Sequence, residues 1–392
     1  MQDRLELTSA AATFRHRLPT ARKVWLNVHL YLGLTAGLVL SLIGLTGSLL
    51  VLGVPIMEME VGSRAFDAAG PIPARAAVDD WIASARRSYA DVTSVDFVVG
   101  PGFGYGGGNA ANVFVQNANG QRSTVTVDPN TGRALGRLRF EETFAFWIIR
   151  IHTQLSSSLS WGRDAVAWLG LVMILSMLTG LYLWWPRNHN WRAALTPKLG
   201  AAGRRRLLDL HNVFAVWLYV PLFVLVFTGV YIIKPQWLDP AIALVSVPRT
   251  PDTAALARAS KPGACAAPIT PGQAADLAQA KFPNSKFVLM VTPEQSQEPF
   301  RVQLAPPNNI EVKGSTIVLI DRECPVILTA IDGEWRNFSE SFRSASFVLH
   351  KDLMLGRVGS AIVFLAGLLM PLSFATGVML WLGKRRNRRR AA

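Results

Sequence analysis

The sequence predicts an all-α transmembrane bundle of four helices, built as two duplicated two-helix halves, with two α+β domains outside the membrane. Three observations support this fold class: four long uncharged windows, basic residues gathered in the short segments between them, and a repeat of histidine-containing motifs. Only 17% of the residues are charged, which is below the roughly 25% that is typical of soluble proteins.

Four windows contain no Asp, Glu, Lys or Arg, and each is longer than the roughly 20 residues that a helix needs to cross a bilayer. They are 24–57, 165–186, 210–233 and 358–383. A helix satisfies its own backbone N–H and C=O groups, which lipid cannot do. The first window is too long for the apolar region of a signal peptide and is followed by no clear cleavage site, so we expect an uncleaved anchor.

The net charge of +14 is concentrated in segments 1–23, 187–209 and 384–392, whereas the long connections 58–160 and 234–357 contain nearly equal numbers of acidic and basic residues. Basic residues favour the cytoplasmic side of a membrane. We therefore expect both termini in the cytoplasm, with the basic segments beside anionic lipid of the bilayer. This explanation of the charge requires no nucleic-acid partner.

The predicted order of segments follows from these windows. It is a cytoplasmic segment 1–23, a helix 24–54, an outer domain 55–144, a histidine element with its helix 145–186, a basic loop 187–209, a helix 210–234, a second outer domain 235–342, a second histidine element with its helix 343–383, and a basic tail 384–392. The first outer domain is expected to combine a helix at 75–90 with strands at 94–99, 112–116 and 123–128. The second is expected to combine a helix at 270–281 with strands near 286–292, 299–304 and 315–320.

The second outer domain contains the only two cysteines, Cys265 and Cys324. They are too few for an iron–sulfur cluster or a cysteine-rich zinc site. In an oxidising compartment they could form a disulfide, but the sequence alone does not decide between a disulfide and two free thiols.

An internal repeat of about 190 residues relates the two halves. Thr46-Gly47 begins 17 residues after His29, and Thr228-Gly229 begins 17 residues after His211. In the second part of each half, His152 and His350 precede two further Thr-Gly pairs. The halves share one membrane orientation, which predicts a pseudo-twofold axis along the membrane normal. Close packing of helices at small residues is a sufficient explanation for the Thr-Gly pairs.

The pseudo-twofold axis predicts that His29 faces His211 and that His152 faces His350. Two facing imidazoles suit a planar cofactor with two axial positions, and heme b needs no Cys-x-x-Cys-His attachment, which is absent here. Zinc fits less well because each pair offers only two ligands. Copper and purely structural histidines remain alternatives to two heme b groups.

Cationic side chains near these histidines are candidate partners for heme propionates. For the outer pair the main candidates are Arg163 and Arg357, with Arg150 and Lys351; for the inner pair they are Arg22, Lys23 and 204–206. Each is equally explained as a base that reaches the membrane surface. The sequence contains no convincing catalytic triad or carboxylate pair, so we expect no catalytic acid, base or nucleophile.

Several blocks resemble the PepSY-associated transmembrane helix family. They are His29 with Gly47-Ser48-Leu49, Leu210-His211-Asn212 with Thr228-Gly229, Ile151-His152 with Leu178-Thr179-Gly180-Leu181-Tyr182-Leu183-Trp184-Trp185-Pro186-Arg187, and the hairpin-like Val127-Asp128-Pro129-Asn130-Thr131-Gly132-Arg133-Ala134-Leu135. The resemblance implies two PepSY-like periplasmic domains, location in the bacterial inner membrane, and His29, His152, His211 and His350 as heme ligands. The second half departs from the pattern at Asp321–Pro325 and at Leu380–Gly383.

The family includes inner-membrane reductases of ferric siderophores of the ferrioxamine-reductase type. The resemblance therefore implies a diheme reductase that takes electrons from a cytoplasmic or quinol donor and reduces a periplasmic ferric siderophore, releasing Fe(II). Two alternatives remain open: a quinol-linked electron-transfer cytochrome, and a PepSY-type sensor that binds no cofactor. A transporter is disfavoured because the windows contain no charged residue to mark an ion path.

Overall fold

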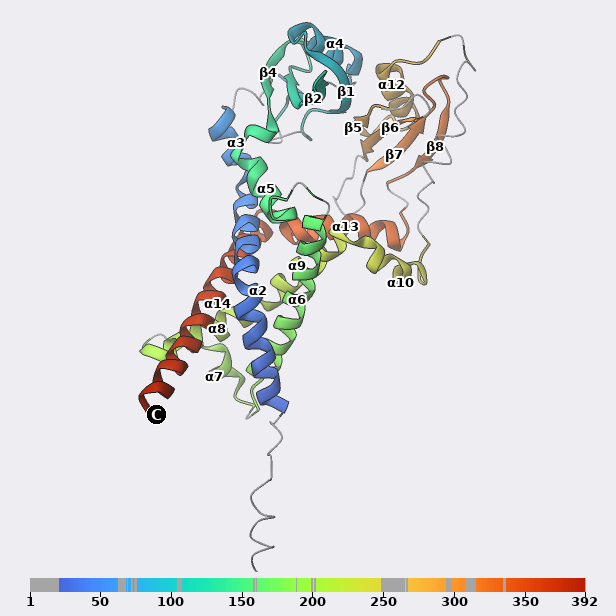
Figure 1. Ribbon diagram of the computed structural model, residues 1–392. Coiled ribbons are helices and arrows are strands. Elements are labelled where there is room, and N and C mark those ends of the chain that lie inside the picture. The colour runs from blue at the N-terminus through green and yellow to red at the C-terminus, as the bar shows by residue number, and fades with distance from the viewer. Residues whose placement is uncertain are drawn as a thin grey trace, which may run out of the picture.

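The computed structural model places a helical region beneath a β-sheet (Figure 1). It describes residues 21–391 with gaps at 63–67, 69, 72, 74–75, 104–107, 158, 160, 188, 199, 201, 248–264, 266, 294–297, 307–314 and 334–335. Most of the predicted cytoplasmic segment 1–23, including Arg4, Arg15 and Arg17, lies outside the described residues.

Three described helices are long and apolar enough to cross a membrane: α2 (Ala21–Val51), α6 (Trp161–Trp184) and α14 (Gly356–Ala391). A fourth candidate consists of α8 (Gly203–Trp217) and α9 (Tyr219–Ile233), which meet at an angle of 63°. By length and composition the chain is a multi-pass membrane protein with three spans, or four if the bent pair is one span.

The prediction of one continuous helix over 210–234 is wrong, because the helix begins at Gly203 and breaks at Leu218. Pro221 explains the break. Proline lacks the N–H that would bond to the carbonyl of Trp217, and its ring clashes with that carbonyl. At the equivalent position in the first half, α2 contains Val39 and continues without interruption.

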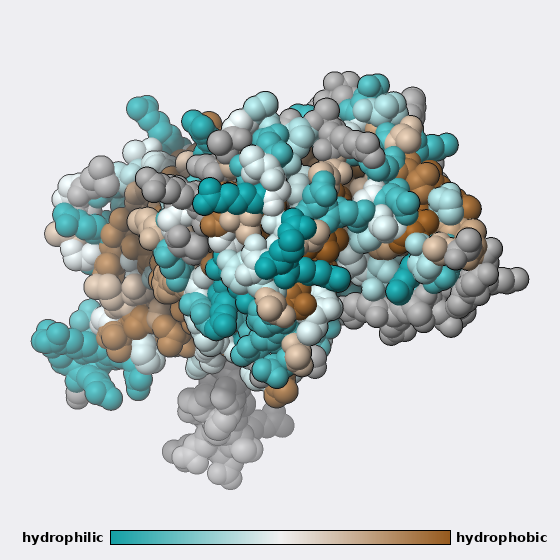
Figure 2. Space-filling view, turned by 90° about the horizontal axis from the view of Figure 1, so that it is seen from above, coloured by the Kyte–Doolittle hydropathy of each residue, from teal (hydrophilic) through white to brown (hydrophobic). Residues whose placement is uncertain are grey.

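Apolar side chains are exposed along all the candidate spans. Examples are Leu38 on α2, Trp168 on α6, Val220 on α9 and Val358 on α14, each at least 60% exposed. Viewed from the sheet side, hydrophilic residues cover the middle of the molecule and hydrophobic residues gather towards its two sides (Figure 2). Such exposed apolar surface is expected where lipid surrounds a protein.

The remaining helices are short. They are α3 (Gly53–Val61), α4 (Val78–Ser88), α5 (Phe144–Gln154), α7 (Trp191–Leu195), α10 (Asp239–Ala243), α12 (Pro271–Lys281) and α13 (Phe338–Asp352), with 3₁₀ turns at Phe140–Glu142 and Pro235–Trp237. Both α5 and α13 begin with a side-chain cap, from Thr143 and Asn337. Both end at a leucine in the left-handed region, Leu155 (φ 52°) and Leu353 (φ 55°). These ends turn the chain into α6 and α14.

The eight strands of the described residues form one antiparallel sheet with the order β4-β3-β2-β1-β5-β6-β7-β8. The strands are β1 (Val92–Val99), β2 (Ala111–Asn117), β3 (Arg122–Val127), β4 (Ala134–Leu138), β5 (Lys286–Val291), β6 (Phe300–Ala305), β7 (Thr316–Ile320) and β8 (Ile327–Ile331). Two separate outer domains were expected. Instead the two units join where Val98 of β1 pairs with Met290 of β5.

Helices α4 and α12 pack on the same face of this sheet. Trp81 and Ala85 of α4 and Ala278 of α12 are buried in one apolar core with Val98 and Met290. The predicted helix start at Thr270 is confirmed, because Thr270 and Gln273 form a capping box. The strands β4 and β8 were not predicted as separate elements.

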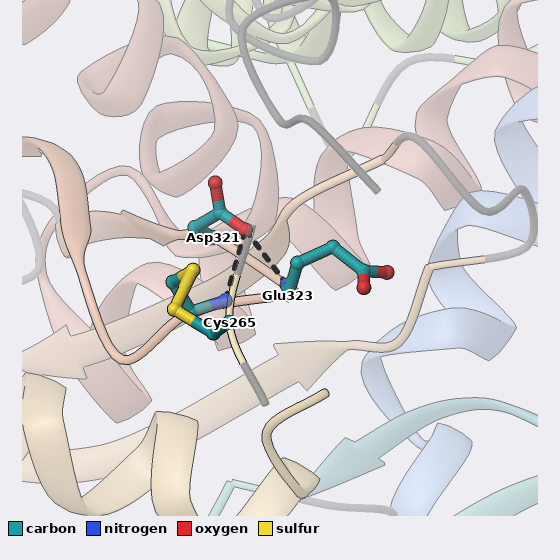
Figure 3. The surroundings of a disulfide bond; sticks show 4 residues. Cys265, Asp321 and Glu323 are labelled. Carbon is teal, nitrogen blue, oxygen red and sulfur yellow. Dashed lines mark hydrogen bonds between the residues drawn. A yellow bond between two sulfur atoms is a disulfide. The ribbon is translucent and has the colours of Figure 1, made fainter. Parts of the chain in front are cut away.

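The last hairpin of each unit contains the same turn. The Asp128 carboxylate accepts hydrogen bonds from the backbone N–H groups of Asn130 and Thr131, at 2.9 and 3.1 Å. The Asp321 carboxylate accepts from those of Glu323 and Cys324, at 2.7 and 3.2 Å (Figure 3). The sequence departure at Asp321–Pro325 therefore does not change the turn.

Cys324 forms a disulfide with Cys265, with a Cα–Cα distance of 5.5 Å. This settles the question that the sequence left open, in favour of the disulfide. The bond ties Cys265, before α12, to the turn between β7 and β8.

The element order of the first half, α2, sheet unit, α5 and α6, recurs as α8–α9, sheet unit, α13 and α14. Between the halves, α2 and α14 approach closely at small residues. A Cβ on Gly44 would lie only 2.6 Å from the Met370 sulfur, and the Ser48 hydroxyl donates to the Phe364 carbonyl at 2.7 Å. Contacts of this kind stabilise helix pairs in membranes.

Candidate functional site

The structure brings the four repeat-related histidines together in two pairs. His29 on α2 and His211 on α8 have ring centroids 6.2 Å apart. His152 on α5 and His350 on α13 have ring centroids 6.0 Å apart. The first is called the terminus-side pair, because it lies towards the ends of the chain, and the second is called the sheet-side pair. Both pairings agree with the prediction from the repeat.

In each histidine the Nδ1 atom lies within hydrogen-bonding distance of a backbone carbonyl on another helix. In the sheet-side pair, His152 reaches Ile43 at 2.9 Å and His350 reaches Leu225 at 2.8 Å. In the terminus-side pair, His29 reaches Ser176 at 3.0 Å and His211 reaches Ser373 at 3.1 Å. Each of the four carbonyls belongs to the residue three positions before a Thr-Gly pair.

Each ring also lies against the glycine of that Thr-Gly pair. A Cβ on the glycine would lie close to the histidine Cε1 atom: 2.9 Å for Gly47 and His152, 2.8 Å for Gly229 and His350, 3.1 Å for Gly180 and His29, and 3.5 Å for Gly377 and His211. A carbonyl and a glycine from a neighbouring helix therefore form a seat for each imidazole. The same seat occurs four times.

These contacts determine which ring nitrogen is available to a metal. A carbonyl oxygen only accepts hydrogen bonds, so Nδ1 of each neutral imidazole carries the proton and Nε2 keeps its lone pair. No described residue forms a hydrogen bond with any of the four Nε2 atoms. Metal-binding histidines typically have this arrangement: one ring nitrogen donates its N–H to a hydrogen-bond acceptor of the protein, and the other ring nitrogen binds the metal.

The electrostatics of the sheet-side pair also favour neutral rings. Helices α5 and α13 lie outside the candidate spans. Burial lowers the pKa of His152 and of His350, and the carbonyl contacts oppose this shift. The imidazole of His152 lowers the pKa of His350 further. The neutral form is the one that binds metal ions.

The spacing within each pair fits one metal between two imidazoles. With metal–nitrogen bonds of about 2 Å and a ring radius of about 1.1 Å, two rings on opposite sides of one metal have centroids about 6 Å apart. The observed values are 6.2 and 6.0 Å. Among the described residues no group of three or more His, Cys, Asp and Glu side chains could hold a metal ion. A cofactor that brings its own equatorial ligands, such as heme, suits this donor set.

A small cavity of about 70 Å³ lies beside the terminus-side pair. His29 and His211 line it together with Gly33 of α2 and Gly377 of α14. Gly33 follows His29 by one helical turn, and a Cβ at this position would meet no atom within 4 Å. The residues present therefore fit a heme in their donor chemistry.

The predicted propionate partners are less closely connected to the histidines. Arg163 and Arg357 lie in the first turns of α6 and α14, and both are exposed. No described hydrogen bond or ion pair links either one to a histidine. The Arg150 guanidinium lies over the rings of Phe146 and Trp147. The propionate assignments therefore stay predictions.

The main residues that sequence reasoning missed are the four Thr-Gly pairs. The constant spacing from histidine to Thr-Gly was visible in the sequence, but it suggested only helix packing. Each pair in fact holds a histidine from a different helix: Thr46-Gly47 holds His152, Thr179-Gly180 holds His29, Thr228-Gly229 holds His350 and Thr376-Gly377 holds His211. A linear repeat contains no information on this exchange between helices.

The fold and the site define a multi-pass membrane protein that holds two pairs of facing histidines beneath a duplicated antiparallel sheet. The chain matches the family of the PepSY-associated TM region over residues 26–384, and it belongs to this family. No curated protein matches the chain.

Proposed function

We propose that the protein is a transmembrane electron-transfer reductase that binds two heme b groups, one at each histidine pair. His29 and His211 hold one heme, and His152 and His350 hold the other. A heme held in this way would supply one-electron redox chemistry. In this proposal the protein lies in the bacterial inner membrane, with both termini in the cytoplasm and the sheet in the periplasm.

The observation that supports this proposal most directly is the geometry of the two pairs. Both have unprotonated Nε2 atoms, a ring spacing that suits one metal, and Nδ1 atoms fixed by backbone carbonyls. The protein residues orient the imidazoles, and burial of the sheet-side rings favours their neutral form.

The substrate in this proposal is a ferric siderophore on the sheet side. One electron from a cytoplasmic or quinol donor enters at the terminus-side pair, and one electron leaves at the sheet-side pair to convert Fe(III) of the chelate to Fe(II). Hard oxygen donors such as those of siderophores suit Fe(III) better than the softer Fe(II), so reduction promotes release of the metal. The reaction requires no acid, base or nucleophile from the protein.

The test is a visible spectrum of the detergent-purified protein before and after dithionite, with heme quantified per chain. Two b-type hemes with six-coordinate reduced spectra support the proposal, and reoxidation by a ferric siderophore tests the substrate. Reoxidation by a quinone alone would instead support the quinol-linked cytochrome. A colourless protein after expression with ample heme would contradict the proposal and favour the PepSY-type sensor.

A further inference from the structure

We propose that Thr46, Thr179, Thr228 and Thr376 are positioning residues that accept a second hydrogen bond from Nδ1 of the paired histidines, reinforce the tautomer that the carbonyls require and strengthen the imidazoles as donors. The hydrogen bond at Nδ1 can be tested in the apoprotein alone. The effect on the bound metal rests on the proposed function.

Each threonine hydroxyl lies near a histidine Nδ1 atom. In the terminus-side pair, Thr179 lies 3.1 Å from His29 and Thr376 lies 3.1 Å from His211. In the sheet-side pair the distances are longer, 3.4 Å from Thr46 to His152 and 3.3 Å from Thr228 to His350. All four threonines are at most 4% exposed. A buried hydroxyl is costly unless its hydrogen-bonding capacity is used.

The hydroxyl protons are already committed to the backbone of the same helix. Thr46 donates to the Leu42 carbonyl at 2.8 Å, and Thr179 donates to the Ser176 carbonyl at 2.9 Å. Thr228 and Thr376 likewise donate to carbonyls four residues earlier, at 2.6 and 2.8 Å. A hydroxyl has one proton and two lone pairs, so each threonine presents only an acceptor to the histidine. The acceptor requires the N–H at Nδ1 and excludes the other neutral tautomer.

The two pairs use this acceptor to different degrees. On the terminus side, Nδ1 is nearly equidistant from the carbonyl and the hydroxyl: 3.0 and 3.1 Å for His29, and 3.1 and 3.1 Å for His211. On the sheet side the carbonyl is about half an ångström closer than the hydroxyl for both His152 and His350. The terminus-side ligands therefore depend on threonine more than the sheet-side ligands do.

The sequence around the seats differs in the same way. The carbonyl residue is serine in both terminus-side seats, Ser176 and Ser373, and aliphatic in both sheet-side seats, Ile43 and Leu225. The difference follows the site and not the half of the chain, because each half contributes one seat of each kind. The four threonines therefore belong to two kinds of seat, matched across the pseudo-twofold axis.

The experiment compares Thr179→Val and Thr376→Val with Thr46→Val and Thr228→Val, each beside its Ser variant. Valine keeps the shape and removes the acceptor, whereas serine restores the hydroxyl. In apoprotein labelled with ¹⁵N-histidine, solid-state NMR reads the Nδ1–H resonance directly, without any cofactor. We expect every variant to keep the Nδ1–H tautomer, because the carbonyls still require it. In the terminus-side Val variants the Nδ1–H proton should shift upfield, because one of its two acceptors is lost, whereas the Ser variants should keep the wild-type shift.

In heme-loaded protein the same variants are compared by midpoint potential and by heme transfer to apomyoglobin. Loss of the acceptor makes the imidazole a weaker donor, so Thr179→Val should raise the potential of one heme and speed its loss by about tenfold. The sheet-side Val variants should change little. An unchanged Nδ1–H resonance in all Val variants would overturn the proposal. Equal effects of Val and Ser would also overturn it, because only packing would then be involved.

If the protein binds no heme, the NMR comparison still tests the threonines, whereas the proposed function fails. If hemes bind and the Nδ1–H resonances do not respond, the proposed function stands and this inference fails. Thermal unfolding of each variant identifies any change that reflects misfolding of the bundle, and the Ser variants serve as the folded reference.

Discussion

The sheet-side and terminus-side histidine pairs make the same kinds of contact, but the seat glycines lie closer to the imidazole rings in the sheet-side pair. In the sheet-side pair the seat glycines leave no room for a methyl group, since Cβ atoms on Gly47 and Gly229 would lie 2.9 and 2.8 Å from Cε1. In the terminus-side pair the corresponding distances, at Gly180 and Gly377, are 3.1 and 3.5 Å. The difference lies between the two sides of the molecule and not between the duplicated halves, because each half contributes one seat to each pair.

The elements that present the histidines differ as well. His152 and His350 lie on short capped helices outside the candidate spans, and a leucine in the left-handed region follows each helix. His29 lies on a long continuous span, and His211 lies on α8, before the break at Leu218. We therefore expect the short capped helices α5 and α13 to restrict the motion of their histidines more than α2 and α8 restrict theirs. The comparison predicts that the two pairs respond differently to equivalent mutations.

The largest expected effect comes from removal of a ligand. His350→Ala should abolish the sheet-side heme and leave the terminus-side heme, and His211→Ala should do the reverse. The reason is that each metal has one ligand from each half of the chain, so one substitution leaves it with a single imidazole. Heme content per chain and the reduced spectrum measure the result. Loss of both hemes from each single variant would mean that the pairs are not independent sites.

The next effect tests the glycine seats. Gly229→Ala places a Cβ 2.8 Å from the His350 ring, which real Cβ contacts do not tolerate, so the ring or the helix must shift. We expect at least about tenfold weaker binding of the sheet-side heme, the magnitude typical when groups that orient a metal ligand are lost. Heme-transfer kinetics measure the change.

The matched control is Gly377→Ala, where the Cβ would lie at an ordinary contact distance of 3.5 Å from the His211 ring. This variant should retain its heme, and it could gain stability because alanine favours a helix by up to about 1 kcal/mol over glycine. Equal losses of heme from Gly229→Ala and Gly377→Ala would show that the distance between the glycine and the histidine ring has no effect on heme binding.

Much of this arrangement could be predicted from the sequence. Uncharged windows located α2, α6 and α14, and the repeat of His29 and His211, and of His152 and His350, predicted the pairs. These features are local or periodic, and lipid imposes a simple rule of length and polarity on them. The capped start of α12 at Thr270 was equally visible, because capping uses neighbouring residues.

The remaining features depend on contacts that distant segments make. The break at Leu218 comes from one proline, Pro221, whereas Pro371 inside α14 does not break its helix. The pairing of β1 with β5 joins two units that each looked complete. The Thr-Gly seats act across helices, so that the glycine that receives His29 is Gly180, more than 140 residues away along the chain. No pattern within one helix indicates such a partner.

A smaller effect is expected from the break itself. Pro221→Ala restores an N–H that can bond to the Trp217 carbonyl, and a continuous helix becomes more favourable by up to about 3 kcal/mol. Straightening would move His211, before the break, but not Gly229, beyond it. We expect several-fold faster loss of the terminus-side heme with an unchanged sheet-side heme. Pro371→Ala is the control, because α14 already continues through that proline. The prediction fails if both proline variants behave alike.

The smallest effect on the histidine pairs is expected from the disulfide. Closure of the loop between Cys265 and Cys324, which are 59 residues apart, restricts the unfolded chain by up to about 4 kcal/mol. Replacement of both cysteines by serine should therefore lower the stability of β5–β8, measured by hydrogen exchange of these strands. The sheet-side heme should nevertheless remain, because the seats of His152 and His350 lie on α2 and α9 and not on the sheet.

This last variant separates two explanations of the closer sheet-side pair. If the sheet presses α13 onto α9, loss of the disulfide should loosen His350 and speed heme loss together with hydrogen exchange in β8. If the glycine seat alone fixes the ring, strand exchange should rise while heme transfer stays at the wild-type rate. The short connection from β8 to α13, which runs from Ile331 to Phe338, makes the first explanation physically possible. We expect the second outcome, because Leu225 and Thr228, which lie within hydrogen-bonding distance of the His350 ring, both belong to α9.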